Sequence, residues 1–317
     1  MDSLSKAYFR FIKEWKNKQN NDHKDFFGLR DFYSLIKYVC SRIINENVSK
    51  DNERACAEIM RRSVERNFDG RPDSIKTFLR ILVLIYKHEA LVERIDEQVD
   101  ILDLISENIS DADKNSRCLL QIVKGEALIY IINQKQVGID KKANNNIIML
   151  HGSTFELDKH SAEYNLLVIS DIITYVARGD VVVMKDVPNS VQTSLYDLLN
   201  KSYQTVGLKN FCRVSVGAHY NPKCFVHPNF NCIVNIMEDR LKEVDPPFLN
   251  RFEKHYLTFN QFLSSDENQI IAELESWIDR LLKEHITKDN PLLSEHYIIN
   301  ICRESLASLA IRSIMEW

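Results

Sequence analysis

Two arginines stand in sequence contexts that suit phosphate chemistry. Arg30 follows Gly28 at the start of an amphipathic segment, where a guanidinium and a helix N-terminus can bind phosphate together. Arg251 lies in the segment 246–254 (PPFLNRFEK), in which Pro247 can open a short helix that presents the arginine outward. An arginine held in this way suits a finger that neutralises transition-state charge on a transferring phosphoryl group.

Each arginine also has a purely structural interpretation. Arg30 could pair with a neighbouring carboxylate, and Arg251 could bond to Glu253 or to the backbone, because such pairs are common on protein surfaces. The sequence by itself leaves both interpretations open.

The residues with which an NTPase hydrolyses its own nucleotide are missing from the chain. A P-loop requires G-x-x-x-x-G-K-S/T after the first strand, but residues 123–128 read VKGEAL, with one glycine. The G-x-G-x-x-G fingerprint of dinucleotide sites is absent as well. After the apolar run 181–184 a single acid, Asp186, stands beside Lys185, and this neighbour disfavours a Mg²⁺ site. We therefore predict that the core binds no nucleotide or metal of its own and hydrolyses no ATP.

Cysteines and histidines cluster between residues 212 and 232, and two kinds of chemistry come into question there. The cluster comprises Cys212, His219, Cys224, His227 and Cys232. Tetrahedral zinc requires two close ligand pairs, and only 224–227 is close, so the spacing supports zinc poorly. A Cys–His hydrolase is supported less, because neither an oxyanion-hole turn nor an orienting third residue can be named.

The elements that must position these residues change character near residue 113. Residues 29–44, 53–67 and a segment from Asp73 show helical periodicity, which predicts a helical bundle over 1–112. Beyond it, apolar runs alternate with helical stretches, which predicts an α/β core over 113–262 with a parallel sheet covered by helices. A helical region follows over 263–317. We expect few apolar contacts between the first bundle and the core.

The predicted elements of the core can be given by residue range. The expected strands are 118–123, 147–150, 181–184 and 232–236, the expected helices 125–135, 161–178 and 189–204, and the expected hairpin pairs 213–216 with 223–226; the C-terminal helices are expected at 265–284 and 297–317.

Composition narrows the class of protein further. The 317 residues carry a formal net charge of −4, which gives no field that would attract nucleic acid. The longest apolar run, 81–86, is far shorter than a transmembrane span. Seven scattered cysteines without a C-x-x-C favour a reducing compartment, the cytosol or the nucleus, and of the two we expect the cytosol.

Several long motifs resemble the mysterin family, giant RING-finger E3 ubiquitin ligases with a dynein-like AAA+ core. The motifs are 26–37 (FFGLRDFYSLIK), 66–70 (RNFDG), 194–200 (SLYDLLN), 226–230 (VHPNF) and 247–256 (PFLNRFEKHY). They follow one another in the family's order and cover most of the chain.

The resemblance implies an AAA+ fold and a role for both arginines. It implies that residues 1–112 are the helical lid of a preceding ATP-hydrolysing unit, 113–262 a unit with degenerate Walker motifs, and 263–317 an incomplete lid. Arg30 then matches a sensor-2 arginine and Arg251 an arginine finger acting in trans. ATP and Mg²⁺ would lie at the seam with the preceding AAA+ unit, and ubiquitin machinery would be reached through the parent protein.

The leading hypothesis is therefore a structural, non-hydrolysing AAA+ unit of a mysterin-type ATPase and ubiquitin ligase. We expect this chain to be inactive alone. The alternative is a stand-alone AAA+-like interaction module without enzymatic activity.

Overall fold

The chain folds into two compact units. The computed structural model describes residues 2–18, 25–49, 52–86, 89–92, 95, 100–110, 116–125, 128–129, 132, 146–153, 155–216, 220–285 and 306. One unit comprises Met1–Ile122 and Ile139–Tyr256, and the other comprises Val123–Gly138 and Leu257–Trp317.

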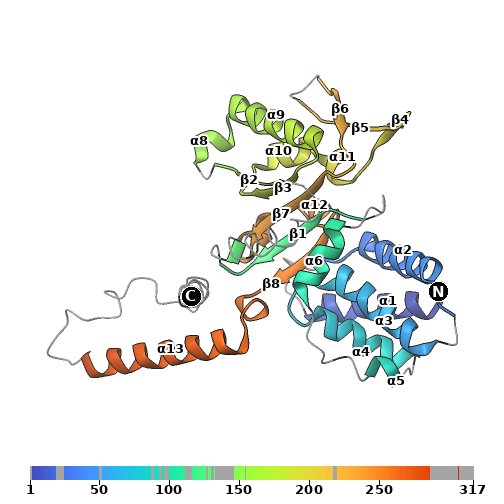
Figure 1. Cartoon of the computed structure of the whole chain (residues 1–317), viewed down its shortest axis with the longest axis vertical. Coiled ribbons are helices and arrows are strands. Elements are labelled where there is room, and N and C mark those ends of the chain that lie inside the picture. Colours follow the sequence, from blue (N-terminus) through green and yellow to red (C-terminus); the bar gives the residue numbers. More distant parts are fainter. Residues whose placement is uncertain are drawn as a thin grey trace. The chain divides into compact units, whose positions relative to one another are not determined.

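The N-terminal part of the first unit is helical, as predicted (Figure 1). Its helices are α1 (Asp2–Lys18), α2 (Leu29–Asn45), α3 (Glu53–Phe68), α4 (Ser74–Tyr86), α5 (Glu89–Val92) and α6 (Ile101–Ser110). The Asp31 carboxylate accepts the Gly28 N–H and so caps α2, while Asn52 caps α3 by accepting the Ala55 N–H. An aromatic cluster that includes Phe11, Phe68 and Phe78 fills the space between these helices.

A five-stranded sheet in the order β2-β3-β7-β1-β8 forms the α/β core. The strands are β1 (Leu119–Val123), β2 (Ile147–His151), β3 (Val181–Lys185), β7 (Asn231–Met237) and β8 (Glu253–Leu257). The pairs β2–β3 and β3–β7 are parallel. All residues of β1 and β3 are buried, which is typical of a parallel sheet covered on both faces. The predicted α/β fold and four of its strands are confirmed.

Helices and a small second sheet surround these strands. They are α8 (Glu156–Lys159), α9 (Ala162–Arg178), α10 (Asn189–Ser194), α11 (Tyr196–Leu199), η2 (Glu238–Glu243) and α12 (Pro246–Leu249), with the antiparallel strands β4 (Gln204–Val206), β5 (Lys209–Arg213) and β6 (Lys223–Val226). Ser161 caps the N-terminus of α9, and Gly179, in the left-handed conformation, ends it.

Three predictions for this region need correction. The helix expected over 189–204 is two short helices followed by β4, because Lys201 adopts a left-handed conformation that ends α11. The first hairpin strand lies at 209–213, not 213–216, and β4 extends the hairpin to three strands. Strand β8 was not predicted.

The N-terminal helices share one hydrophobic core with the sheet, so the expectation of few apolar contacts is wrong. The same cluster contains Phe11 of α1, Phe68 of α3, Leu120 of β1, Val234 of β7 and Phe252. This cluster places the helices and the sheet in one compact unit, although the division at residue 112 remains a prediction.

The second unit contains α13 (Ser265–His285), which confirms the helix predicted over 265–284. The helix predicted over 297–317 and most of the one predicted over 125–135 lie outside the described residues. Among the helices that the structure describes, none combines the length and hydropathy needed to cross a membrane.

Candidate functional site: an arginine pair beside helix α11

Arg30 is exposed at the start of α2. Its backbone follows Gly28, whose extended conformation precedes the first turn of the helix. The Arg30 guanidinium donates a hydrogen bond to Asn200 Oδ1 at 3.0 Å. The expected carboxylate partner is not found within the described part of the chain, so the charge of Arg30 is not neutralised by an ion pair there.

Arg251 follows the short helix α12, whose first two residues are the prolines of the motif. The Arg251 N–H donates to Phe248 O at 3.1 Å, which fixes the backbone at the end of the turn. Its guanidinium carbon lies 3.7 Å from the centre of the Tyr196 ring. The Nε atom is buried and has no hydrogen-bond partner among the described residues.

The structural interpretation of Arg251, a bond to Glu253, does not match the geometry. Glu253 is buried and instead accepts hydrogen bonds from Arg66 at 2.9 Å and Asn108 at 2.9 Å. The two residues diverge because β8 begins at Glu253 and carries its side chain into the protein, away from the turn that holds Arg251.

The two predicted arginines lie close enough to influence each other. Burial lowers the pKa of Arg251, and the positive charge of Arg30 lowers it further, while Tyr196, Asp197 and Asp245 act in the opposite direction. No carboxylate within the described ranges forms an ion pair with either guanidinium. Two like charges held together in this way would be stabilised by an anion that accepts hydrogen bonds from both.

A buried ion network behind the pair fixes α2 to the core. The Lys254 ammonium lies 3.0 Å from each Asp31 carboxylate oxygen, and both side chains are completely buried. Arg117 also donates to Asp31 Oδ1, at 2.7 Å, and Asn250 Oδ1 lies 3.5 Å from the Lys254 ammonium. Because Asp31 is adjacent to Arg30, this network sets the position of Arg30 relative to the Arg251 turn.

Sequence reasoning missed the members of this network. The sequence analysis assigned no role to Asp31, Lys254 or Arg117, because their partners are distant in the chain. A single sequence carries only a weak signal for such a network. Asp31 is one charged residue near the start of a helix, and Lys254 lies in a run in which apolar residues are not the majority.

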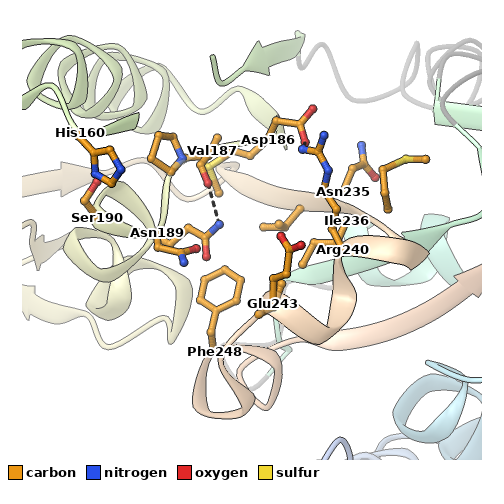
Figure 2. A pocket seen from close by; sticks show the side chains of 16 residues that line it. His160, Asp186, Val187, Asn189, Ser190, Asn235, Ile236, Arg240, Glu243 and Phe248 are labelled. Carbon is orange, nitrogen blue, oxygen red and sulfur yellow. Dashed lines mark hydrogen bonds and ion pairs between the residues drawn. The ribbon is translucent and has the colours of Figure 1, made fainter. Parts of the chain in front are cut away.

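The carboxyl ends of β3 and β7 border a cavity of about 430 Å³ (Figure 2). Asp186 lies on its wall and is held in two ion pairs, with Lys185 at 3.0 Å and with Arg240 at 2.8 Å. A carboxylate with two cationic partners has few lone pairs left for Mg²⁺, whose usual ligands are carboxylates without such partners. Phe248 of α12 forms part of the cavity wall.

The cysteine–histidine cluster is not assembled by the described residues. Cys212 and Cys224 are directly paired across β5 and β6, but Cys232 belongs to the other sheet. His227 Nδ1 accepts the Asn229 N–H at 3.1 Å, and His219 lies outside the described residues. Burial raises the pKa of Cys212 to about 12, which argues against a thiolate nucleophile there.

The sheet order, the helices that pack against it and the arginine that precedes the last strand define an AAA+ domain. Residues 106–263 match the family described as the RNF213 AAA domain. The chain therefore belongs to the RNF213, or mysterin, family, as its motifs indicated.

Individual relatives support the same assignment. The E3 ubiquitin-protein ligase RNF213 of Homo sapiens is 29% identical over 331 aligned positions, which cover 99% of this chain and 6% of that protein. RNF213 of Mus musculus is 29% identical over 87% of the chain, and rnf213-beta of Danio rerio is 27% identical over 87%. The chain thus spans about one-twentieth of the length of these relatives.

Proposed function

We propose that this chain is a non-hydrolysing AAA+ unit whose Arg251 and Arg30 act on ATP bound by the preceding AAA+ unit. Arg251 would serve as the arginine finger, and Arg30 as the sensor-2 arginine. ATP and Mg²⁺ would lie at the seam between the two units. The parent would be a ubiquitin ligase of the cytosol, because the RNF213 relatives are E3 ubiquitin-protein ligases.

The convergence of the two arginines is the observation that carries this proposal. They come from segments more than 200 residues apart, yet both contact helix α11: Arg251 lies over Tyr196, and Arg30 donates to Asn200. Both guanidiniums lack an ion-pair partner among the residues described. A transferring phosphoryl group carries several negative oxygens, and two guanidiniums can contact different oxygens at once.

Two observations support a unit that does not hydrolyse ATP itself. The chain has no G-K-S/T sequence, so the lysine and hydroxyl that bind phosphate and Mg²⁺ in a P-loop are missing. Asp186, the acid at the end of β3, is engaged by Lys185 and Arg240. The arginines of this unit would then act in ATP hydrolysis by the preceding unit.

The test is ATP turnover in a polypeptide that joins this chain to the AAA+ unit preceding it in the relatives. We expect Arg251→Ala to lower kcat by about 10³–10⁵-fold, the range measured for arginine fingers. Arg251→Lys should not restore the rate, because an ammonium cannot reproduce the planar fork. The melting temperature should fall by only a few degrees, since the Arg251 guanidinium makes no ion pair within the described residues and the variant loses only its contact with the Tyr196 ring.

Unchanged turnover in Arg251→Ala would refute the finger and favour the alternative, an AAA+-like interaction module without enzymatic activity. A collapse of the fold would instead return Arg251 to a structural role. Lys209→Ala, at the exposed first residue of β5, is a suitable control.

A further inference from the structure

The short helix α11 contacts both arginines of the candidate site. Tyr196, its first residue, lies under the Arg251 guanidinium at 3.7 Å. Asn200, which caps its C-terminus, accepts the hydrogen bond from Arg30 at 3.0 Å. Residues four apart on a helix lie on the same face, so one face of α11 carries both contacts.

The ends of α11 are fixed by the fold. Leu198 and Leu199 are buried, and they anchor the helix in the hydrophobic core. At its C-terminus the Lys201 N–H donates to Leu198 O and the Ser202 N–H donates to Asp197 O. This pair of bonds is a Schellman motif, and Lys201 takes the left-handed conformation that the motif requires. Asn200 therefore has a fixed position relative to Tyr196.

The Tyr196 ring is the main contact that orients the Arg251 guanidinium. The 3.7 Å separation is short for a cation–π contact, which extends to about 6 Å. The Tyr196 ring also stacks against Phe248, whose ring centre lies 6.4 Å away at an interplanar angle of 30°. Because Arg251 Nε has no hydrogen-bond partner among the residues described, stacking takes the place of a hydrogen bond.

We infer that α11 positions the arginine pair, with Tyr196 as the positioning residue for Arg251 and Asn200 as that for Arg30. Neither residue touches the reacting atoms; each acts through an arginine. The inference deepens the proposed function and rests on it for its catalytic consequence. It also gives the segment 194–200 a role that its sequence alone does not reveal.

The stacking itself is tested on the full 317-residue chain by NMR of the arginine Nε–Hε groups. Arg251→Lys removes one resonance and thereby assigns it. We expect Tyr196→Leu to move this resonance, because the ring no longer lies over the guanidinium, and Tyr196→Phe to leave it nearly in place. Thr193→Ala, an exposed change on α10, gives the background shift. A resonance unmoved by Tyr196→Leu overturns the inference.

The catalytic consequence is tested by ATP turnover in the polypeptide that includes the preceding unit. Tyr196→Leu should lower kcat by about 10- to 100-fold with little change in KM, as a misplaced catalytic group does. Tyr196→Phe should retain the wild-type kcat. Equal losses in Tyr196→Phe and Tyr196→Leu would overturn the inference, because the ring would then not be the active feature.

The two proposals fail in different ways. If Arg251→Ala leaves turnover unchanged, the proposed function is wrong, and the resonance of Arg251 alone decides whether Tyr196 positions it. If Arg251→Ala abolishes turnover while Tyr196→Leu does not lower it, the function stands and the positioning role is refuted. If Tyr196→Leu does not fold, Asn200→Ala decides: it should move the Arg30 resonance and lower kcat, and no change in either overturns the inference.

Discussion

At the scale of single residues, the buried imidazole of His255 lies between two carboxylates. Its Nδ1 lies 2.9 Å from Asp69 and its Nε2 lies 3.2 Å from Glu253, so both ring nitrogens face an acceptor. Burial alone would lower the pKa of His255, but the hydrogen bonds to Asp69 and Glu253 raise it to about 9. The imidazolium thus joins α3 and its following turn to β8.

This arrangement predicts that the protein becomes less stable between pH 6.5 and pH 8. Below pH 6.5 His255 is protonated in both states and its contribution is complete. As the pH rises towards 9, the unfolded chain loses the proton first, so the contribution is progressively lost. The free energy of unfolding should fall by about 2 kcal/mol between pH 6.5 and pH 8. Urea titrations at the two pH values measure it.

Lys254 sets the upper end of the pH range over which stability should fall. Burial lowers the pKa of Lys254 to about 8, although Asp31 opposes the shift. A lowered lysine pKa makes stability rise with pH between 8 and 10.5, which offsets the loss from His255. His255→Gln should flatten the curve between pH 6.5 and pH 8; an unchanged slope in that variant would assign the effect to another group.

At the scale of elements, apolar runs allowed most of the sheet to be predicted. Strands β1, β3 and β7 are buried on both faces, so their sequences are almost continuously apolar, as in LLQIV and VVVMK. A run of this kind needs no knowledge of distant residues to be recognised.

Strand β8 could not be predicted in the same way. Its sequence, EKHYL, has three ionisable residues in succession, and Glu253, Lys254 and His255 are all buried. They are stable there because Arg66, Asp31 and Asp69 pair with them from nearly 190 residues or more away. Periodicity describes neighbours along the chain and carries no information about such partners.

The candidate site, too, could be predicted only in part. Motifs identified Arg30 and Arg251 and the short proline-led helix before Arg251. The sequence did not reveal that Tyr196 and Asn200 hold these arginines, because a cation–π contact and a single amide bond leave no periodic signal.

Two glycines test how tightly the elements around the sheet are packed. Gly179, which ends α9, and Gly207, in the β4–β5 turn, both have positive φ, of 86° and 62°. A Cβ at Gly179 would lie 2.3 Å from His227 Nδ1, whereas one at Gly207 would have nothing within 4 Å. Gly207→Ala should therefore cost only the backbone strain of about 1–2 kcal/mol. Gly179→Ala should cost about 1–3 kcal/mol more, because it overpacks the site.

Chemical denaturation of the two alanine variants separates strain from packing. Since both share the left-handed backbone, the difference between their unfolding free energies reports the contact with His227. Equal destabilisation would show that His227 moves aside freely, and the close approach of α9 to the segment after β6 would then be unimportant.

At the scale of the whole molecule, two arrangements of charged side chains can be contrasted. One is the buried ion pair, and the other is the pair of arginines beside α11. In the first unit, buried ions such as Arg66, Glu253, Asp31 and Lys254 have opposite partners close by. The arginines beside α11 are exceptions to this pattern among the residues described. We therefore expect the isolated chain to attract anions weakly at this arginine pair.

The last prediction follows from this division: the isolated chain should bind ATP·Mg²⁺ more weakly than about 1 mM, that is, with less than about 4 kcal/mol. The sequence VKGEAL at 123–128 has no G-K-S/T, whose lysine and hydroxyl bind phosphate and Mg²⁺ in a P-loop, and Asp186 is engaged in ion pairs. The exposed Arg30 and the half-buried Arg251 would give a weak, salt-sensitive attraction for any polyphosphate. Calorimetry with ATP·Mg²⁺ and with tripolyphosphate at two salt concentrations measures this. We expect both ligands to bind with similar weak affinity and this binding to be lost in Arg251→Ala. A micromolar affinity for ATP that disappears in Lys124→Ala would instead mean that the core has a nucleotide site of its own.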